Sequence, residues 1–221
     1  MTARSDSLVA RGTAVHVGSS TGFARGEIVD GEGNLRAIGT CRRIIRSSEL
    51  GEHVALRTLA AAPQPPLELP SMEPRFEPEV TSRADLDAFL RSKLARRLGL
   101  TVSEVRERTV IVHIPVSNDL TNIFGMIHGG AVSLFAEVAI AVALHALLPA
   151  GSSFAVLDFA INFLRPVPPD GAVDGEAEVV HSGRRFSVVR VQLRNPDGRI
   201  AAIGSSTVYL AGGADRISPD A

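Results

Sequence analysis

One long apolar segment, residues 123–148, constrains the fold more than any other part of the sequence. Its sequence, IFGMIHGGAVSLFAEVAIAVALHALL, is long and apolar enough to resemble a membrane-spanning helix. However, it contains His128, Glu137 and His145, it has no flanking cluster of Lys or Arg, and a carboxylate in the middle of a bilayer is costly. We therefore expect a helix over residues 130–148 that is buried inside a soluble protein, with no membrane association.

A shorter helix is predicted ahead of the long one, over residues 81–98. Its apolar residues recur at helical spacing, at Leu86, Phe89, Leu90, Leu94 and Leu98. Thr81 or Ser82 can cap its start, Asp85 lies in its first turn, and Gly99 can end it. The folded unit is therefore expected to open with a helix.

The remaining segments around the long helix predict strands. Residues 105–116 alternate enough to form a strand ahead of it, and Pro149 and Gly151 stop the helix. Four strand-like runs follow, at residues 153–164, 172–182, 185–195 and 199–210. The sequence Asn195-Pro196-Asp197-Gly198 is a strong turn signal between the last two. This order predicts an α+β fold in which a curved antiparallel sheet wraps around the long central helix.

The first part of the chain repeats the last part. Shifting residues 8–45 by 165 positions places them on residues 173–210 without a gap. Eight residues then meet identical residues: Val15, His16, Gly18, Arg25, Gly33, Ala37, Ile38 and Gly39 meet Val180, His181, Gly183, Arg190, Gly198, Ala202, Ile203 and Gly204. Any two hairpins look somewhat alike, but glycines in register over a gapless match favour a true duplication.

These patterns divide the chain into four parts. Residues 1–55 are interpreted as a partial repeat with only the last three strands of the unit, so either the tandem is shortened or the start lies inside a longer reading frame. Residues 56–80 are expected to be an extended linker, because residues 60–80 contain six prolines. Residues 81–211 form the complete unit, and residues 212–221 are expected to be a disordered tail.

Composition excludes several classes of function. Lys and Arg total 23 and Asp and Glu total 24, so the net charge of −1 does not suggest a nucleic-acid binder. The single cysteine, Cys41, cannot form an intrachain disulfide, and no Cys/His cluster has the spacing of a zinc site. We expect no metal or other cofactor. A cytoplasmic location fits this cysteine usage and the lack of an apolar signal peptide in residues 1–12.

The long helix carries the candidate chemistry. Glu137 is its one charged residue, and a carboxylate there must be paired, solvated by a cleft or used for chemistry. Gly129 and Gly130 lie where the helix begins, where free backbone N–H groups can polarise a carbonyl oxygen. The alternatives are a local hydrogen bond for Glu137, a tight turn at the glycines, and a capping or core role for His128.

Spacing along the helix adds a prediction about assembly. Gly129 and Glu137 are eight residues apart, which is about 12 Å along a helix and too far for both to act on one carbonyl carbon. If both serve one reaction, the carboxylate must come from a second copy of the helix. The spacing therefore predicts a homodimer or higher homo-oligomer with active sites at the interface.

These residues resemble a known family. The pattern of Asn122, five residues, His128-Gly129-Gly130, six residues and Glu137 resembles the hotdog-fold thioesterases of the PaaI and 4-hydroxybenzoyl-CoA types. The segment LDFAINFLRPVPPDG, residues 157–171, resembles the second strand and Arg-Pro turn of that family. The ending GRIAAIGSSTVYL resembles its last strand, so that the resemblance covers residues 105–211.

The resemblance implies hydrolysis of an acyl-CoA, or a related acyl thioester, to a free acid and a thiol. Gly129 would donate its N–H to the thioester oxygen, and Glu137 of the neighbouring subunit would be the general base or the nucleophile. Asn122 would position the water or the thioester. His128 would support the loop and the carbonyl site.

The resemblance also suggests residues that bind the substrate. Gly130 lies beside the thioester site, and Arg165, Arg184 and Arg185 are candidates to contact the phosphates of CoA. Some family members hold the water with a Ser or Thr near the start of the second strand. Val156 occupies that position here, with Ser152 and Ser153 just before it, which leaves the role unassigned.

Two other functions remain open. The partial repeat has no His-Gly-Gly sequence and no acidic helix residue, so it should be catalytically silent. Its incompleteness makes a non-catalytic acyl-CoA-binding or scaffold protein the main alternative. A hotdog hydratase or dehydratase is the second, although its differently spaced His and acidic partner are not found.

Overall fold

The computed structural model describes residues 7–18, 21–44, 82–83 and 85–211. These residues belong to two compact units, one within Met1–Ser71 and the other within Met72–Ala221. We call them the partial unit and the complete unit and describe each by itself. The expected linker over residues 56–80 and the expected tail over residues 212–221 lie outside the described residues.

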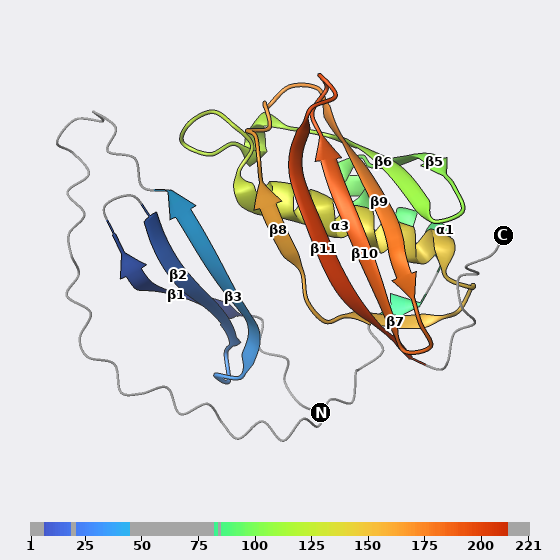
Figure 1. Cartoon of the computed structure of the whole chain (residues 1–221), viewed down its shortest axis with the longest axis horizontal. Coiled ribbons are helices and arrows are strands. Elements are labelled where there is room, and N and C mark those ends of the chain that lie inside the picture. Colours follow the sequence, from blue (N-terminus) through green and yellow to red (C-terminus); the bar gives the residue numbers. More distant parts are fainter. Residues whose placement is uncertain (1–6, 19–20, 45–81, 84, 212–221) are drawn as a thin grey trace. The chain divides into compact units, whose positions relative to one another are not determined.

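The complete unit is built around helix α3 (Gly129–Leu147), which crosses the inner side of a curved sheet (Figure 1). Phe135, Val138 and Val142 on this helix are fully buried. Among the described residues, α3 is the one helix with the length and apolar composition of a membrane span, and most of that span is buried inside the unit. Core packing against the sheet therefore explains the apolar sequence of α3.

The sheet has eight antiparallel strands in the order β4-β7-β11-β10-β9-β6-β5, and β8 also pairs with β11. The strands are β4 (Ser82–Arg83), β5 (Thr101–Val105), β6 (Thr109–Pro115), β7 (Ser153–Val156), β8 (Ala160–Phe163), β9 (Ala172–Ser182), β10 (Phe186–Arg194) and β11 (Ile200–Ala211). Alternate residues of β10, namely Val189, Val191 and Leu193, are fully buried against α3. The predicted α+β fold, a curved antiparallel sheet around a long helix, is confirmed.

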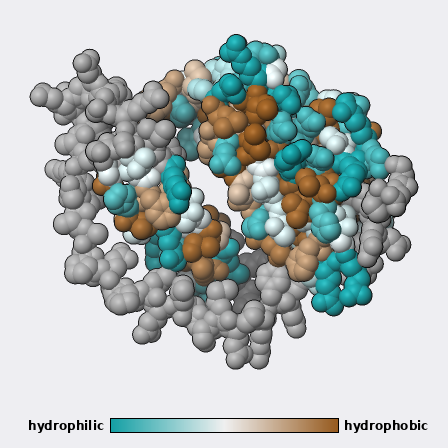
Figure 2. Space-filling view, in the orientation of Figure 1, coloured by the Kyte–Doolittle hydropathy of each residue, from teal (hydrophilic) through white to brown (hydrophobic). Residues whose placement is uncertain are grey.

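The outer side of this sheet mixes hydrophilic and hydrophobic residues (Figure 2). Arg190 of β10 forms an exposed ion pair at 2.6 Å with Glu178 of the neighbouring strand β9. The sheet is therefore apolar toward α3 and mixed on its other face, as expected for antiparallel strands with one buried side.

Two of the predicted strands are wrong in extent. The run 153–164 is split into β7 and β8, because residues 157–159 lie outside both strands and Asp158 accepts hydrogen bonds from β11. The run 105–116 is a hairpin rather than one strand, since β5 ends at Val105 and β6 begins at Thr109. The polar sequence Arg106-Glu107-Arg108 forms the turn, which the N–H of Arg106 closes on the carbonyl of Thr109.

The predicted helix over residues 81–98 is also wrong in extent. It is replaced by α1 (Leu86–Leu90) and α2 (Lys93–Leu98), with Ser82 in strand β4. Asp85 caps α1 instead of lying in its first turn, and Ser92 caps α2 by accepting the N–H of Ala95. A capping hydroxyl inside the run restarts the helix, which apolar periodicity alone does not detect. Gly99 ends α2 in the left-handed conformation, as predicted.

His145 packs against two aromatic rings. Its ring lies 4.7 Å from that of Phe89 and 5.1 Å from that of Phe154, measured between centroids. Its Nδ1 also accepts the N–H of Asp85, the cap of α1. His145 therefore holds the short helix α1 against the last turn of α3.

The described residues of the partial unit form three strands, as predicted for this part of the chain. Strands β1 (Leu8–Val17), β2 (Thr21–Asp30) and β3 (Leu35–Ile44) form an antiparallel sheet in that order. The turn between β2 and β3 is organised by Asp30, whose carboxylate accepts hydrogen bonds from the backbone of Glu32 and from Asn34 and Arg36. No helix lies among residues 7–18 and 21–44.

Candidate active site

The start of α3 leaves one backbone donor free. His128 caps the helix, and its ring Nδ1 accepts the N–H of Gly130 at 3.0 Å. The carbonyl oxygen of His128 accepts the N–H groups of Ala131 and Val132. Among the described residues, none accepts the N–H of Gly129. Of the two candidate glycines, therefore, it is Gly129 whose N–H can bind an incoming carbonyl oxygen.

An aromatic ring lies beside this donor. A Cβ atom on Gly129 would be 3.6 Å from Cζ of Phe163, a residue of β8 whose side chain is 54% exposed. Pairing of Phe163 with Ala202 of β11 brings the ring to the helix start. The sequence pattern did not single out Phe163, although this residue lies in the segment 157–171 that resembles the second strand of the family. Only the strand register identifies it as a neighbour of Gly129.

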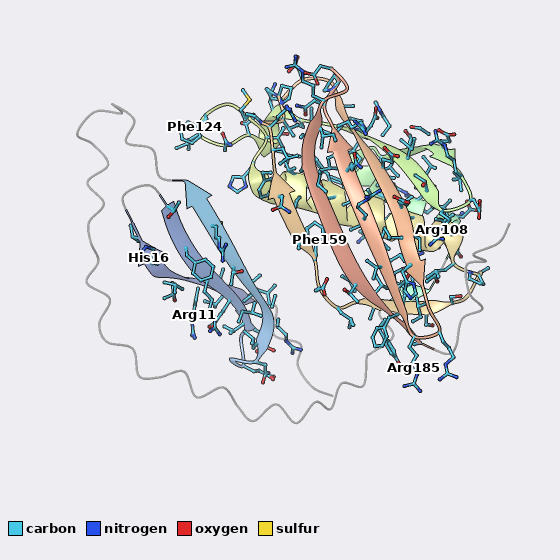
Figure 3. The ribbon with its side chains drawn as sticks, viewed as in Figure 1. Arg11, His16, Arg108, Phe124, Phe159 and Arg185 are labelled. Carbon is cyan, nitrogen blue, oxygen red and sulfur yellow. The ribbon has the colours of Figure 1, made fainter. Side chains whose placement is uncertain are left out.

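Asn122 holds the loop that precedes α3. Its side-chain Oδ1 accepts the N–H of Phe124 at 2.8 Å, and its backbone N–H donates to the carbonyl of Met126. Gly125 adopts the left-handed conformation in the same turn. The side-chain carbonyl of Asn122 is thus used by the loop, which leaves its amide N–H groups to act on a substrate or water. Figure 3 labels Phe124 on this loop, where Phe124 is 68% exposed.

Glu137 lies two turns into α3 on a stripe that the sheet does not cover. Gly130, Ser133, Leu134 and Glu137 recur at helical spacing and are all partly or fully exposed, whereas most of the helix is buried. Burial raises the pKa of Glu137 above its ordinary value of 4.5. No described residue forms a hydrogen bond or an ion pair with its carboxylate. The side chain is therefore available for chemistry.

Glu137 and Gly129 do not meet within one chain. Both belong to the single continuous helix α3, eight residues apart, a separation of about 12 Å. Ser133 lies midway between them, and its hydroxyl donates to the carbonyl of Gly129 at 2.9 Å. Sequence reasoning did not single out Ser133, whose place on the open stripe follows only from the packing of α3.

The three candidate arginines lie at two different ends of β11. Arg165 follows β8 and donates from its guanidinium to the carbonyl of Ile200 at 2.7 Å, at the end where Phe163 pairs with Ala202. Arg184 and Arg185 lie in the β9–β10 turn, where the N–H of Leu210 donates to the carbonyl of Arg185.

Ala202 and Leu210 are eight positions apart on β11, which is about 26 Å of strand. Figure 3 labels Arg185 at that far end of the hairpin. Within one chain, then, Arg165 lies on the side of Gly129, and the structure does not bring Arg184 or Arg185 there.

The position expected to hold a catalytic water is apolar. Val156 lies at the end of β7 and is 39% exposed. Ser153 pairs with Ala211 at the far end of β11, away from Phe163. Among the described residues, no group of three or more His, Cys, Asp and Glu side chains could hold a metal ion.

Comparison with known proteins shows that this unit is similar to thioesterases. Residues 124–202 match the model of the Thioesterase superfamily. A protein of Vibrio cholerae with a provisional esterase name is 28% identical over 125 residues, which cover 57% of this chain and 83% of that protein.

Solved structures have the same fold. A thioesterase of Haemophilus influenzae is 25% identical with a TM-score of 0.51, over 57% of this chain and 87% of that one. The PaaI protein of Escherichia coli, from the phenylacetic acid degradation operon, has a TM-score of 0.52 at 22% identity, over 58% and 91% of the two chains. The similarity to PaaI shows the fold alone.

Proposed function

We propose that the complete unit, which is similar to the Thioesterase superfamily over residues 124–202, is a thioester hydrolase that converts an acyl-CoA to a free acid and CoA. The observation that carries this proposal is the free N–H of Gly129 at the start of α3. A donor held by the helix, next to the exposed ring of Phe163, suits the carbonyl oxygen of a thioester.

The proposed reaction begins with polarisation of the thioester. The N–H of Gly129 and the positive end of the α3 dipole stabilise the negative charge that develops on the carbonyl oxygen. The carboxylate of Glu137 removes a proton from water, whose oxygen forms the new bond to the carbonyl carbon. The carbon–sulfur bond then breaks, and the thiolate takes up the proton. A raised pKa suits a general base, because it moves the carboxylate closer to the working pH.

Direct attack by Glu137 is the second form of the mechanism. The carboxylate would form a mixed anhydride with the acyl group as the thiolate leaves, and water would then hydrolyse the anhydride. Both forms need the same two groups, the N–H of Gly129 and an ionised Glu137.

Both forms also need a second subunit, because Gly129 and Glu137 of one chain are about 12 Å apart. We propose a homodimer in which the open stripes of two α3 helices face each other in opposite directions. A two-fold axis that places Gly129 against Glu137 of the partner subunit passes beside Ser133, the midpoint of the two. The small residues Gly130 and Ser133 on this stripe allow the helices to approach closely.

The proposal of CoA as the thiol rests on position and charge. Arg165 lies at the same end of β11 as Phe163 and uses one guanidinium N–H group on the carbonyl of Ile200. Its other donors are suited to a phosphate. Arg184 and Arg185 would contact the phosphates of CoA only if the CoA moiety extends to a different subunit.

The test is release of free thiol from a panel of short, medium, long and aromatic acyl-CoAs, with wild type beside Glu137→Gln. Release that disappears in the variant supports the proposal, and the preferred substrate identifies the acyl group. No release by a folded dimeric wild type favours the alternative, a non-catalytic acyl-CoA-binding protein. Retained acyl-CoA affinity in both proteins would identify that alternative.

A further inference from the structure

The partial unit matches one part of the complete unit in its strands. The shift of 165 residues that aligns the two sequences also places β1, β2 and β3 on β9, β10 and β11. In both sets the strands are antiparallel. The second strand in the chain, β2 or β10, lies between the first and the third.

The irregularities of the two sheets coincide as well. Val15 is left unpaired between Ala14 and His16 of β1, and its counterpart Val180 is left unpaired in β9. A second interruption skips Arg36 in β3 and its counterpart Ala201 in β11. Two bulges at matching residues favour a true duplication over chance similarity between hairpins.

Both turns are closed by equivalent hydrogen bonds. The N–H of Gly18 donates to the carbonyl of Thr21 at 2.8 Å, and the counterpart Gly183 donates to Phe186 at 2.8 Å. The N–H of Asp30 donates to Asn34 at 3.0 Å, just as its counterpart Asn195 donates to Arg199 at 3.0 Å. The partial unit therefore has the geometry of β9–β11, as well as a related sequence.

The two sheets differ in what covers them. In the complete unit, Val189, Val191, Leu193 and Ser206 share the face toward α3 and are buried. Their counterparts Ala24, Gly26, Ile28 and Cys41 are exposed on one face of the partial unit, with Ile28 at 38%. We call this set the open face.

The edges of the two sheets differ in the same way. In the complete unit, β9 pairs with β6, and β11 pairs with β7 and β8. Among the described strands, β1 and β3 pair only with β2. The helix and both flanking strands are thus the elements that the partial unit lacks within the described residues.

We propose that the open face is a docking surface for a second hotdog segment with the order of residues 109–163, namely a strand, a long apolar helix and a strand. The chain itself provides the evidence for this occupant, because α3, β6, β7 and β8 cover the matching face of β9–β11. The α3 helix of this chain is not the occupant, since its own sheet already buries it. The small residues Ala24 and Gly26 leave room for the close approach of a helix.

The rate of alkylation of Cys41 can show whether the open face is covered. It is exposed, it is the only cysteine in the sequence, and its counterpart Ser206 is 2% exposed. The experiment joins a second copy of residues 100–172 directly to Leu8 of the chain, in place of residues 1–7, because the same residues directly precede Val173, the counterpart of Leu8. Alkylation of Cys41 should be at least ~100-fold slower in this extended chain than in the unmodified chain.

A matched pair of variants tests whether docking causes the protection. In the extended chain, Gly26→Trp should restore the reactivity of Cys41, since it fills the open face. A Cβ there meets only the backbone oxygen of Arg11, at 4.0 Å, so a side chain can begin at this position without a clash with the strand. Thr13→Trp, on the opposite face, should leave Cys41 protected.

Three results would overturn the proposal. The first is a Cys41 in the extended chain that reacts as fast as in the unmodified chain, while circular dichroism shows that the added helix has formed. The second is an added segment that stays unfolded beside the open face. The third is a Cys41 that is already protected in the unmodified chain and becomes reactive on dilution, because a second copy would then be the occupant.

Discussion

The Nδ1 atom of His128 accepts the N–H of Gly130 at 3.0 Å, so one helix-start donor is used by the protein itself. The neighbouring N–H of Gly129 is left without an acceptor among the described residues. This division of roles between two adjacent glycines leads directly to the first two predictions.

Replacing Gly129 with proline should remove the proposed donor without disrupting α3. Proline has no N–H and is favoured at the first position of a helix, and the extended backbone of His128 is compatible with a following proline. We expect kcat/KM to fall by roughly 10²–10³, with little change in the unfolding temperature. The matched control is Gly129→Ala, which keeps the N–H and places a Cβ at an ordinary 3.6 Å from Phe163. Equal loss of activity in both variants would argue against the N–H as the active group.

Replacing His128 with alanine should weaken the start of α3. Loss of a helix cap costs about 1 kcal/mol, so the free energy of unfolding should fall by that amount. His128→Asn, which can also cap the helix, should recover most of the stability in urea unfolding. If the alanine variant unfolds at the wild-type urea concentration, the hydrogen bond to Gly130 does not stabilise the helix.

Replacing Glu137 with glutamine should lower turnover by at least ~10²-fold while leaving the fold intact, because glutamine has nearly the same shape but cannot accept the proton. Thiol release under saturating substrate measures this loss. Turnover at the wild-type rate would exclude Glu137 as base and as nucleophile.

The same residue predicts the pH dependence. Because burial raises the pKa of Glu137 in the folded protein, the acid limb of the rate profile should lie above 4.5, and activity should fall as pH drops through it. The free energy of unfolding depends on pH in the opposite direction to the activity. The folded state binds the proton more tightly, so the free energy of unfolding decreases as pH rises from the unfolded pKa through the folded pKa. Glu137→Gln should abolish this contribution, which a comparison of urea unfolding at several pH values would detect.

Mixing two inactive variants tests whether the partner supplies the carboxylate. A mixed dimer of Gly129→Pro and Glu137→Gln chains has one site with both changes and one site with neither. Since about half of the randomly mixed dimers are mixed, roughly a quarter of the wild-type activity should return after unfolding and refolding together. Mixtures that stay inactive, although mixed dimers form, would mean that both groups act from one chain.

Cross-linking tests the position of the two-fold axis. In a Cys41→Ser background, Ser133→Cys should form a disulfide-linked dimer on mild oxidation, because the axis is expected to pass beside this residue. Ser205→Cys, exposed in the middle of β11, serves as the control and should remain monomeric under denaturing electrophoresis. A monomeric Ser133→Cys protein would contradict the antiparallel pairing of the α3 helices.

Local signals in the sequence were enough to predict the elements whose boundaries depend on residues close together in the chain. The apolar run before Pro149 predicts α3 almost to its ends, and Asn195-Pro196-Asp197-Gly198 forms the predicted turn, with Gly198 in the left-handed conformation. Side-chain periodicity, missing N–H groups and the freedom of glycine act within a few residues, so they can be recognised without a structure. The sequence also predicts a repeat, through glycines in register.

The tertiary structure decided which of these residues meet. Strand register brings Phe163 to Gly129 and carries Arg185 to the far end of β11. The ring of His128, not the sequence pattern, determines which glycine keeps a free N–H. The sheet buries most of α3 and leaves the stripe around Glu137 open. These relationships depend on pairings between residues far apart in the chain, and hydrophobic periodicity contains no information about which strands become neighbours or in which register.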